Sequence, residues 1–185
     1  MKIIFLDIDG VIATPASLNE SGTWELTNEC QDNLEYLLKH TGAKIVISSS
    51  WRKHTLEDTI EYLKEHGFRS CSEVIGVTIR AYRYIEKGIH LSIPRGVEIK
   101  QWIDTNVHTL FLPNEKKEFV RKGIGQDFTY IILDDDTDML LEQKDYFIRT
   151  DPTKGLSTSD VDKAISILNF RQLHTSYSKR KNEAT

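Results

Sequence analysis

The chain begins with a short apolar run that ends in two aspartates. Residues 3–6 (Ile-Ile-Phe-Leu) are continuously apolar, which is typical of a strand buried on both faces of a parallel sheet. Asp7 ends the run, Asp9 follows two residues later, and Gly10 allows the backbone to turn away. Ligands of open α/β sheets bind beyond the carboxyl ends of the strands. Because neighbouring carboxylates repel each other unless a cation joins them, the pair predicts a hard divalent metal ion, with at least one carboxylate free for chemistry.

Two later apolar segments also end in polar clusters. Residues 43–47 are followed by Ser48 and Ser49, and residues 130–133 by Asp134 and Asp135. The carboxyl ends of parallel strands share one edge of a sheet, so we expect these clusters to lie beside the first aspartates. One cluster alone could be a cap or a turn, whereas three on one edge indicate a site.

Helical patterns separate the strands. The predicted helices run from Thr27 to Leu38, Thr55 to His66, Pro94 to Ile103 and Ser159 to Leu168, and further strands from Ser72 to Ile79 and from Tyr146 to Thr150. The segment between Ala13 and Thr27 is expected to be a loop with a small hairpin. The alternation of strands and helices implies an α/β fold with parallel pairing and right-handed crossovers.

Length and composition narrow the class of protein. The 185 residues suit one domain, which we place at residues 1–170 with a polar, basic tail at 171–185. The net charge of -4 argues against a wholly basic nucleic-acid-binding surface but not against a local basic patch. Two cysteines are too few for a disulfide framework. No run approaches the roughly 20 apolar residues of a membrane span, and the start is too acidic for a signal peptide, so we expect a cytoplasmic protein without a membrane partner.

The three clusters together resemble the motifs of the haloacid dehalogenase (HAD) superfamily. Residues 7–11 (DIDGV) are similar to its first motif, DxDG[TV]. Residues 45–48 (IVIS) are similar to its second motif, and residues 132–138 (ILDDDTD) to its fourth. The resemblance covers residues 1–168. It implies a three-layer α/β/α Rossmann-like parallel sheet and a Mg²⁺-dependent phosphatase that forms an aspartyl-phosphate.

The resemblance implies a role for each acid. Asp7 would attack phosphorus, and Asp9 would protonate the leaving oxygen and then help to deprotonate water. Asp134 would bind Mg²⁺ with the Asp7 carboxylate and the Asp9 backbone carbonyl. The second acid at the metal would be Asp138 in the DxxxD form of the motif, or Asp135 in the adjacent-acid form.

The remaining motif residues would contact the phosphoryl group. The Ser48 hydroxyl would donate a hydrogen bond, helped by the backbone amide of Ser49. The third motif is a cation, for which Arg95 is the first candidate because it stands where the predicted helix opens, just before Gly96, and Lys100 is the alternative. Arg52 could bind a substrate phosphate or be a solvated cation at a helix start.

The substrate class is less strongly indicated. Residues 48–52 (SSSWR), 95–102 and 133–136 resemble the small phosphatase domains associated with nucleic-acid repair, such as that of polynucleotide kinase. Residues 80–87 mix arginines, tyrosines and a lysine, which suits a nucleic-acid strand, although an exposed strand or turn would have the same composition. Trp51 could stack on a base or pack in the core.

The gaps between the motifs leave room for a minimal cap or none. Residues 109–129 have no clear period and could form at most a small lid. An open site would admit the terminal phosphate of a nucleotide or polynucleotide, which we take as the leading substrate. The alternatives are a small-metabolite phosphomonoesterase and a metal-binding partner module without catalysis.

Overall fold

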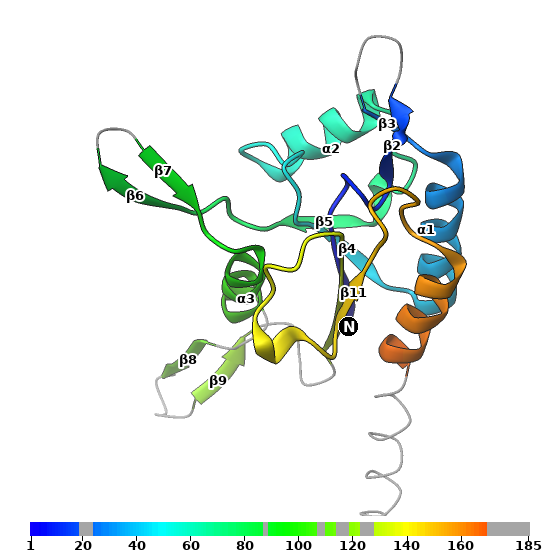
Figure 1. The fold of residues 1–185 in the computed structure, drawn as a ribbon. Coiled ribbons are helices and arrows are strands. Elements are labelled where there is room, and N and C mark those ends of the chain that lie inside the picture. Colours follow the sequence, from blue (N-terminus) through cyan, green and yellow to red (C-terminus); the bar gives the residue numbers. More distant parts are fainter. Residues whose placement is uncertain (19–23, 87–88, 107–109, 114–118, 123–127, 170–185) are drawn as a thin grey trace, which may run out of the picture.

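The computed structural model contains a five-stranded parallel sheet. It describes residues 1–18, 24–86, 89–106, 110–113, 119–122 and 128–169. The strand order across the sheet is β11 (Phe147–Arg149), β10 (Thr129–Asp134), β1 (Lys2–Leu6), β4 (Lys44–Ile47) and β5 (Val74–Val77) (Figure 1). Every neighbouring pair is parallel, which confirms the predicted pairing.

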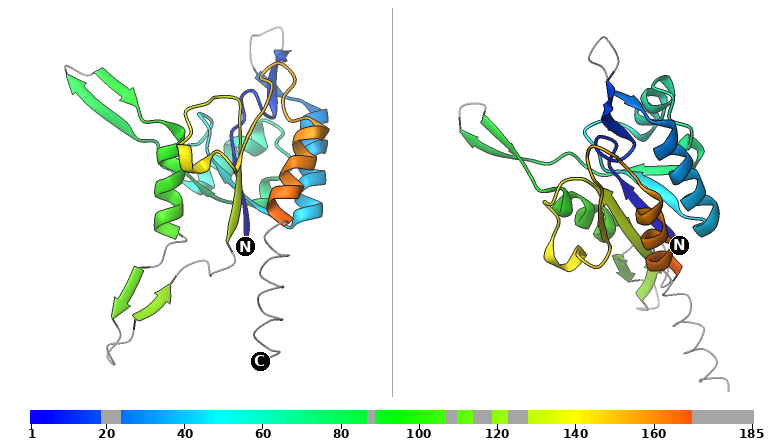
Figure 2. Two further views of the ribbon diagram at one scale, coloured as in Figure 1. Left: turned by 60° about the horizontal axis from the view of Figure 1, so that its bottom comes forward. Right: turned by 45° about the vertical axis from the view of Figure 1, so that its right-hand side comes forward.

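Helices cover both faces of the sheet and make three layers (Figure 2). On one face, α1 (Asn28–Thr41), α2 (Leu56–Glu65) and a helix at residues 158–169 pack on a large apolar cluster. On the other face, α3 (Arg95–Asn106) packs on a smaller cluster. The predicted three-layer α/β/α Rossmann-like fold is therefore confirmed.

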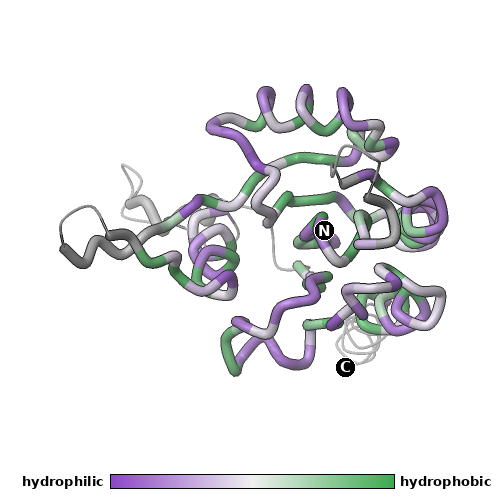
Figure 3. The backbone as a smooth tube through the Cα atoms, turned by 45° about the horizontal axis from the view of Figure 1, so that its top comes forward, coloured by the Kyte–Doolittle hydropathy of each residue, from purple (hydrophilic) through white to green (hydrophobic). Residues whose placement is uncertain are grey.

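Alternate residues of the central strands feed the two cores. Ile4 and Leu6 of β1 belong to the larger cluster, whereas Ile3 and Phe5 belong to the smaller one. This alternation follows from the period of two in a strand, and it explains why the run is apolar at every position. Figure 3 shows these hydrophobic strand segments between helices of mixed hydropathy.

Several element ends differ from the prediction by a few residues. Helix α1 continues to Thr41 and ends at Gly42, whose φ of 64° suits glycine. Helix α3 begins at Arg95, one residue after the predicted start, and extends to Asn106, three residues beyond the predicted end. The predicted strand 72–79 begins instead with a 3-10 turn, Cys71–Glu73, so that β5 covers only four residues.

Three antiparallel hairpins connect the larger elements in the part of the chain that the structure describes. The first, β2 (Ala13–Leu18) with β3 (Trp24–Leu26), confirms the small hairpin expected after the first motif. The second, β6 (Tyr82–Glu86) with β7 (Ile89–Ser92), leads into α3. The third, β8 (Leu110–Pro113) with β9 (Phe119–Lys122), lies in residues 109–129, for which at most a small lid was predicted. The predicted tail at 171–185 lies outside the described residues. Among the helices that are described, none has the length and apolarity needed to span a membrane.

Candidate active site

The three polar clusters meet at one edge of the sheet, as expected. The backbone N–H of Asp7 donates to the carbonyl of Leu133 on β10, 3.0 Å away. The N–H of Ser48 donates to the carbonyl of Leu6 on β1, 2.8 Å away. The ladder of the sheet thus continues one residue beyond the strands and brings Asp7, Ser48 and Asp134 side by side.

Three carboxylates form an acid cluster, which we define as Asp7, Asp134 and Asp135. One oxygen from each lies within 4.8 Å of the others. Asp7 and Asp134 are only 6% and 1% exposed. Oδ1 of Asp134 accepts from the N–H of Asp136 at 3.0 Å, whereas its buried Oδ2 has no hydrogen-bond partner among the described residues. A buried carboxylate oxygen without a donor is costly, and an all-oxygen donor set suits Mg²⁺, so these residues fit a hard divalent cation.

Electrostatics lead to the same conclusion. Burial raises the pKa of Asp7, against the opposing effects of the Arg95 guanidinium and of a hydrogen bond from Ser49. Burial and the neighbouring charge of Asp7 raise the pKa of Asp134 to about 8. Burial also raises the pKa of Asp135. Burial therefore disfavours the ionised form of each of these three groups, and a bound cation would favour it.

Arg95 is the cation beside the acid cluster. Its Nη2 lies 3.6 Å from Oδ2 of Asp7, and its Nε lies 3.6 Å from Oδ2 of Asp134. Its Nη1 donates to the backbone carbonyl of Ser48. The first residue of α3 thus spans three strand ends.

The alternative cation, Lys100, does not lie at the cluster. Its half-exposed ammonium pairs with Asp104 at 3.1 Å and with Glu142 at 3.7 Å. It stands more than one turn further along α3, where the helix has left the edge of the sheet.

The structure also separates the two candidates for the second acid. Asp135 belongs to the acid cluster. Asp138 instead accepts from the backbone N–H of Arg95 through Oδ2, at 2.7 Å, and its carbonyl accepts from the N–H of Gly96 at 3.3 Å. Asp138 therefore holds the start of α3 and positions Arg95 through the backbone.

Position 10 requires a glycine because the side chain of Asp135 packs against its Cα. Its φ is 70°, and a Cβ placed on it would lie 2.4 Å from Cγ of Asp135. Any larger residue would strain the backbone and push this carboxyl group out of the cluster. The turn is also tied from the other side, because the Thr150 hydroxyl donates to the Gly10 carbonyl at 2.8 Å.

The carboxylate of Asp9 lies outside the acid cluster and has its own partners. Oδ2 accepts from the Ser50 hydroxyl at 3.0 Å, and Oδ1 accepts from the indole N–H of Trp51 at 2.8 Å. This agrees with a side chain that is kept for proton transfer rather than for metal binding. Sequence analysis did not assign either donor, although both stand in the serine-rich segment after β4.

Ser48 and Ser49 are both buried. The Ser49 side chain lies beside the predicted nucleophile and opposes the rise in the pKa of the Asp7 carboxyl group. The hydroxyl of Ser48 accepts from the hydroxyl of Thr78 at 3.3 Å. A substrate contact by Ser49 would therefore involve its backbone N–H, as the resemblance implies.

Arg52 is neither a solvated cation nor an open phosphate ligand. It is 8% exposed, its Nη2 pairs with Oε2 of Glu98 at 2.6 Å, and its Nη1 donates to the Thr78 hydroxyl. Burial lowers the pKa of its guanidinium, and the charge of Glu98 opposes that shift. The other oxygen of Glu98 accepts from the N–H of Ala81 at 2.8 Å. The ion pair of Arg52 and Glu98 joins the loop after β4 to α3. Sequence analysis assigned no partner to Arg52, although Glu98 lies in the first turn of the predicted helix.

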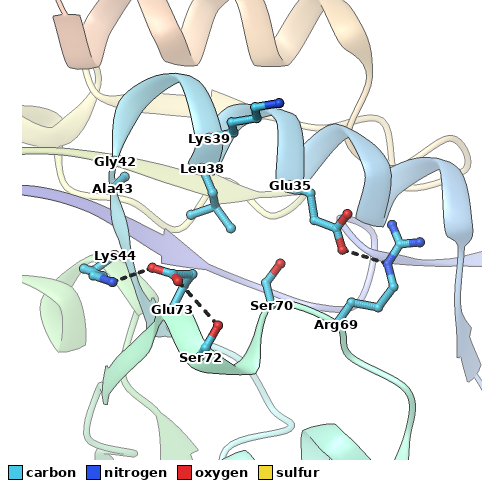
Figure 4. Close-up of a pocket in the computed structure, with 10 residues that line it drawn as sticks. All are labelled: Glu35, Leu38, Lys39, Gly42, Ala43, Lys44, Arg69, Ser70, Ser72 and Glu73. Carbon is cyan, nitrogen blue, oxygen red and sulfur yellow. Dashed lines mark hydrogen bonds and ion pairs between the residues drawn. The ribbon is translucent and has the colours of Figure 1, made fainter.

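A separate pocket lies at the opposite end of β4 (Figure 4). Its volume is about 370 Å³, and it is lined mainly by α1, the start of β4 and the segment before β5. Four of its five charged residues form ion pairs with one another, Lys44–Glu73 at 2.5 Å and Arg69–Glu35 at 2.9 Å. It contains no residue of the acid cluster.

One comparison with known families gives a match. Residues 3–161 match the family described as the HAD domain in Swiss Army Knife RNA repair proteins. No curated protein matches the chain. The match covers most of the sequence and all of the predicted motifs, which confirms the resemblance to HAD domains of the nucleic-acid-repair type. The chain belongs to this family.

Proposed function

We propose that this member of the family of HAD domains in Swiss Army Knife RNA repair proteins is a Mg²⁺-dependent phosphatase that acts on the terminal phosphate of a nucleic-acid strand. Family membership supports a HAD phosphoesterase. The observation that carries the proposal is the buried pair of Asp7 and Asp134, with one guanidinium 3.6 Å from each. This arrangement suits a dianionic phosphoryl group and a metal ion.

In the first step, a carboxylate oxygen of Asp7 attacks phosphorus and forms an acyl-phosphate bond. The bond from phosphorus to the leaving oxygen breaks, and that oxygen takes its proton from Asp9. Arg95 would stabilise the charge on the phosphoryl oxygens, and the Ser48 hydroxyl and Ser49 N–H would orient them. Asp7, Asp134 and Asp135 would hold Mg²⁺, which neutralises the repulsion between carboxylates and phosphate.

In the second step, water attacks the phosphorus of the aspartyl-phosphate. Asp9, now a carboxylate, takes a proton from the water, and the phosphorus–oxygen bond to Asp7 breaks. Inorganic phosphate leaves, and both aspartates return to their starting states. The separation of Asp9 from the acid cluster supports this second role, because its side chain is held by Ser50 and Trp51.

The β6–β7 hairpin supports a polynucleotide as the substrate. It projects from the rest of the molecule (Figures 1 and 2). Its base is fixed at the site: the N–H of Ile93 donates to the Ala81 carbonyl at 3.1 Å, and Arg80 donates to the Ser50 carbonyl at 2.5 Å. The base of the hairpin thus lies next to Ser50, whose hydroxyl donates to Asp9.

The composition of this hairpin fits such a strand. In its register Tyr82 pairs with Ser92 and Tyr84 with His90, so these positions share one face. Residues 80–92 hold three Arg or Lys and one Glu, in a chain whose net charge is -4. Aromatic and basic residues together suit a single strand, because they provide stacking surfaces and balance the phosphates.

A panel of phosphoesters tests the proposal. We expect phosphate release from 3′- or 5′-phosphorylated oligonucleotides, loss of this activity with EDTA, and its return with Mg²⁺. Asp7→Asn keeps the shape of the side chain but cannot form the acyl-phosphate, so no phosphate should be released. Equal or greater activity on sugar phosphates would instead favour the small-metabolite phosphomonoesterase. Protein that binds Mg²⁺ but hydrolyses no phosphoester would favour a non-catalytic partner module.

A further inference from the structure

The segment after β4 holds the two motif aspartates in different ways. Ser49 lies beside Asp7, whereas the next two residues, Ser50 and Trp51, each donate to one oxygen of Asp9. The distances to Asp9 are 3.0 and 2.8 Å. Both oxygens of the proposed acid–base carboxylate are therefore held by protein donors that belong to neither the metal site nor the substrate.

The indole of Trp51 is itself held in place. Its ring makes edge contacts with Tyr62 of α2, at 5.7 Å between centroids, and with His66 at the end of that helix, at 5.3 Å. The ammonium of Lys53 lies 3.3 Å from the centre of the Tyr62 ring. Trp51 also packs against the larger apolar cluster. The direction of its N–H is thus set by packing that does not depend on Asp9.

An indole N–H suits the positioning of a group that exchanges protons. It is a donor only, and it does not titrate in the range where a carboxyl group does. It can therefore hold the Asp9 carboxylate without competing for its proton. The Ser50 hydroxyl can rotate, so this second hydrogen bond can adjust as Asp9 gains and loses a proton.

We infer that Trp51, with Ser50, is a positioning residue for proton transfer by Asp9. The inference rests on the proposed phosphatase function. The two donors hold the carboxylate away from the acid cluster, so that it faces the leaving oxygen instead of binding the metal. This differs from both roles considered from the sequence, since Trp51 acts through its N–H and not by stacking on a base or by packing alone.

The dependence of the rate on the leaving group tests this role. A nitrophenolate leaves without a proton, whereas the alkoxide of an alkyl phosphate needs one, so only the second substrate depends on Asp9 in the first step. The ratio kcat/KM reports that step. Trp51→Phe removes the N–H and keeps an aromatic ring. We expect a loss of about 10- to 100-fold with an alkyl phosphate such as glycerol phosphate, and of less than about threefold with para-nitrophenyl phosphate.

Matched variants separate positioning from packing. Trp102→Phe makes the same chemical change at a tryptophan that packs on Phe5 in the smaller cluster, and it should change both substrates alike. In an Asp9→Asn background, Trp51→Phe should cause no further loss with the alkyl phosphate. Ser50→Ala alters an exposed residue with little risk to folding and should show the same selectivity in a weaker form.

The possible outcomes are distinct. Equal losses on both substrates, or no loss on either in Trp51→Phe and Ser50→Ala, would overturn the inference while leaving the phosphatase in place. A loss seen only with phosphorylated oligonucleotides, and not with glycerol phosphate, would assign Trp51 to base contact and would also overturn it. Wild-type protein that hydrolyses no phosphoester would overturn the proposed function itself.

Discussion

The two ends of the parallel sheet both carry charged side chains but arrange them differently. At the amino end, in and beside the pocket of Figure 4, Lys44 pairs with Glu73, and Arg69 pairs with Asp32 and Glu35. These pairs are partly or largely exposed to solvent. At the carboxyl end, three carboxylates with raised pKa values face one guanidinium, and two of them are almost completely buried.

In the pairs at the amino end each charged side chain has an oppositely charged partner, whereas at the carboxyl end the carboxylates outnumber the guanidinium beside them. Exposed pairs are already solvated and complete, so they add little to stability. Buried carboxylates in excess of their partners destabilise the protein alone, and they are retained where a ligand completes them. The carboxyl end of the sheet is therefore where function is expected, although the pocket lies at the amino end.

The largest expected effect comes from removing the guanidinium at the acid cluster. Arg95→Ala should lower kcat/KM for a phosphorylated oligonucleotide by on the order of 10²- to 10³-fold, because a preorganised cation at the phosphoryl oxygens is lost. Arg95→Lys should recover part of this, since it restores a charge but not the fork. Lys100→Ala, on the same helix but paired at the surface, should change the rate less than about twofold. A larger loss of kcat/KM in Lys100→Ala than in Arg95→Ala would contradict the assignment of Arg95 as the cation that contacts the phosphoryl group.

The second prediction concerns the buried ion pair of Arg52 and Glu98, which joins the loop after β4 to α3. Glu98→Gln leaves the Arg52 guanidinium buried without its counter-charge, and we expect a loss of about 3 kcal/mol in the free energy of unfolding. Glu73→Gln, the matched change in an exposed pair, should cost less than about 0.5 kcal/mol. Urea unfolding of both variants measures the difference. Equal losses of unfolding free energy in the two variants would mean that burial does not make the Arg52–Glu98 pair more important for stability than the exposed Lys44–Glu73 pair.

Much of the carboxyl end of the sheet was predictable from the sequence. The apolar run before Asp7 placed that residue at a strand end, and parallel pairing then brought Ser48 and Asp134 beside it. Such inferences succeed because a strand ladder fixes neighbours to within a residue. Arg95 was the first candidate cation because of its place at a helix start, with Lys100 as the alternative, and the structure places the Arg95 guanidinium 3.6 Å from Asp7.

The parts that could not be predicted depend on side-chain direction across long sequence separations. Arg52 and Glu98 are 46 residues apart, and nothing local shows that they meet. The donors to Asp9 are 41 and 42 residues away from it. The choice between Asp135 and Asp138 depended on which carboxyl group turns toward Gly10 and which toward α3, and that is set by tertiary packing.

A third prediction is that a mutation in the acid cluster stabilises the metal-free protein. Asp134 has a pKa of about 8 when folded, against an ordinary value of 3.8, so the folded state binds a proton that the unfolded chain releases. Its contribution to stability is present at low pH and is lost as the pH rises from about 4 to about 8. At pH 8, metal-free Asp134→Asn should therefore be more stable than the wild type, by on the order of 1 kcal/mol.

Magnesium should reverse this order. Thermal unfolding with EDTA or with Mg²⁺, at pH 6 and pH 8, should show that the metal stabilises the wild type and not Asp134→Asn. Asp136→Asn alters a neighbouring but exposed carboxylate and serves as the control. An Asn variant that is less stable than the wild type under every condition would mean that Asp134 is already satisfied by the protein, as the charges at the amino end are.

The smallest expected effect tests the amino end directly. Lys44 and Glu73 are separated by only 2.5 Å, yet their side chains are 43% and 34% exposed. Solvent screening and the entropy of two long side chains should limit their coupling to less than about 1 kcal/mol. A double-mutant cycle of Lys44→Ala and Glu73→Ala by urea unfolding measures it, with phosphatase activity followed in parallel. A larger coupling would show that proximity alone can stabilise an exposed pair. A change in activity without a change in stability would mean that the pocket takes part in function, and the contrast between the two ends would then no longer hold.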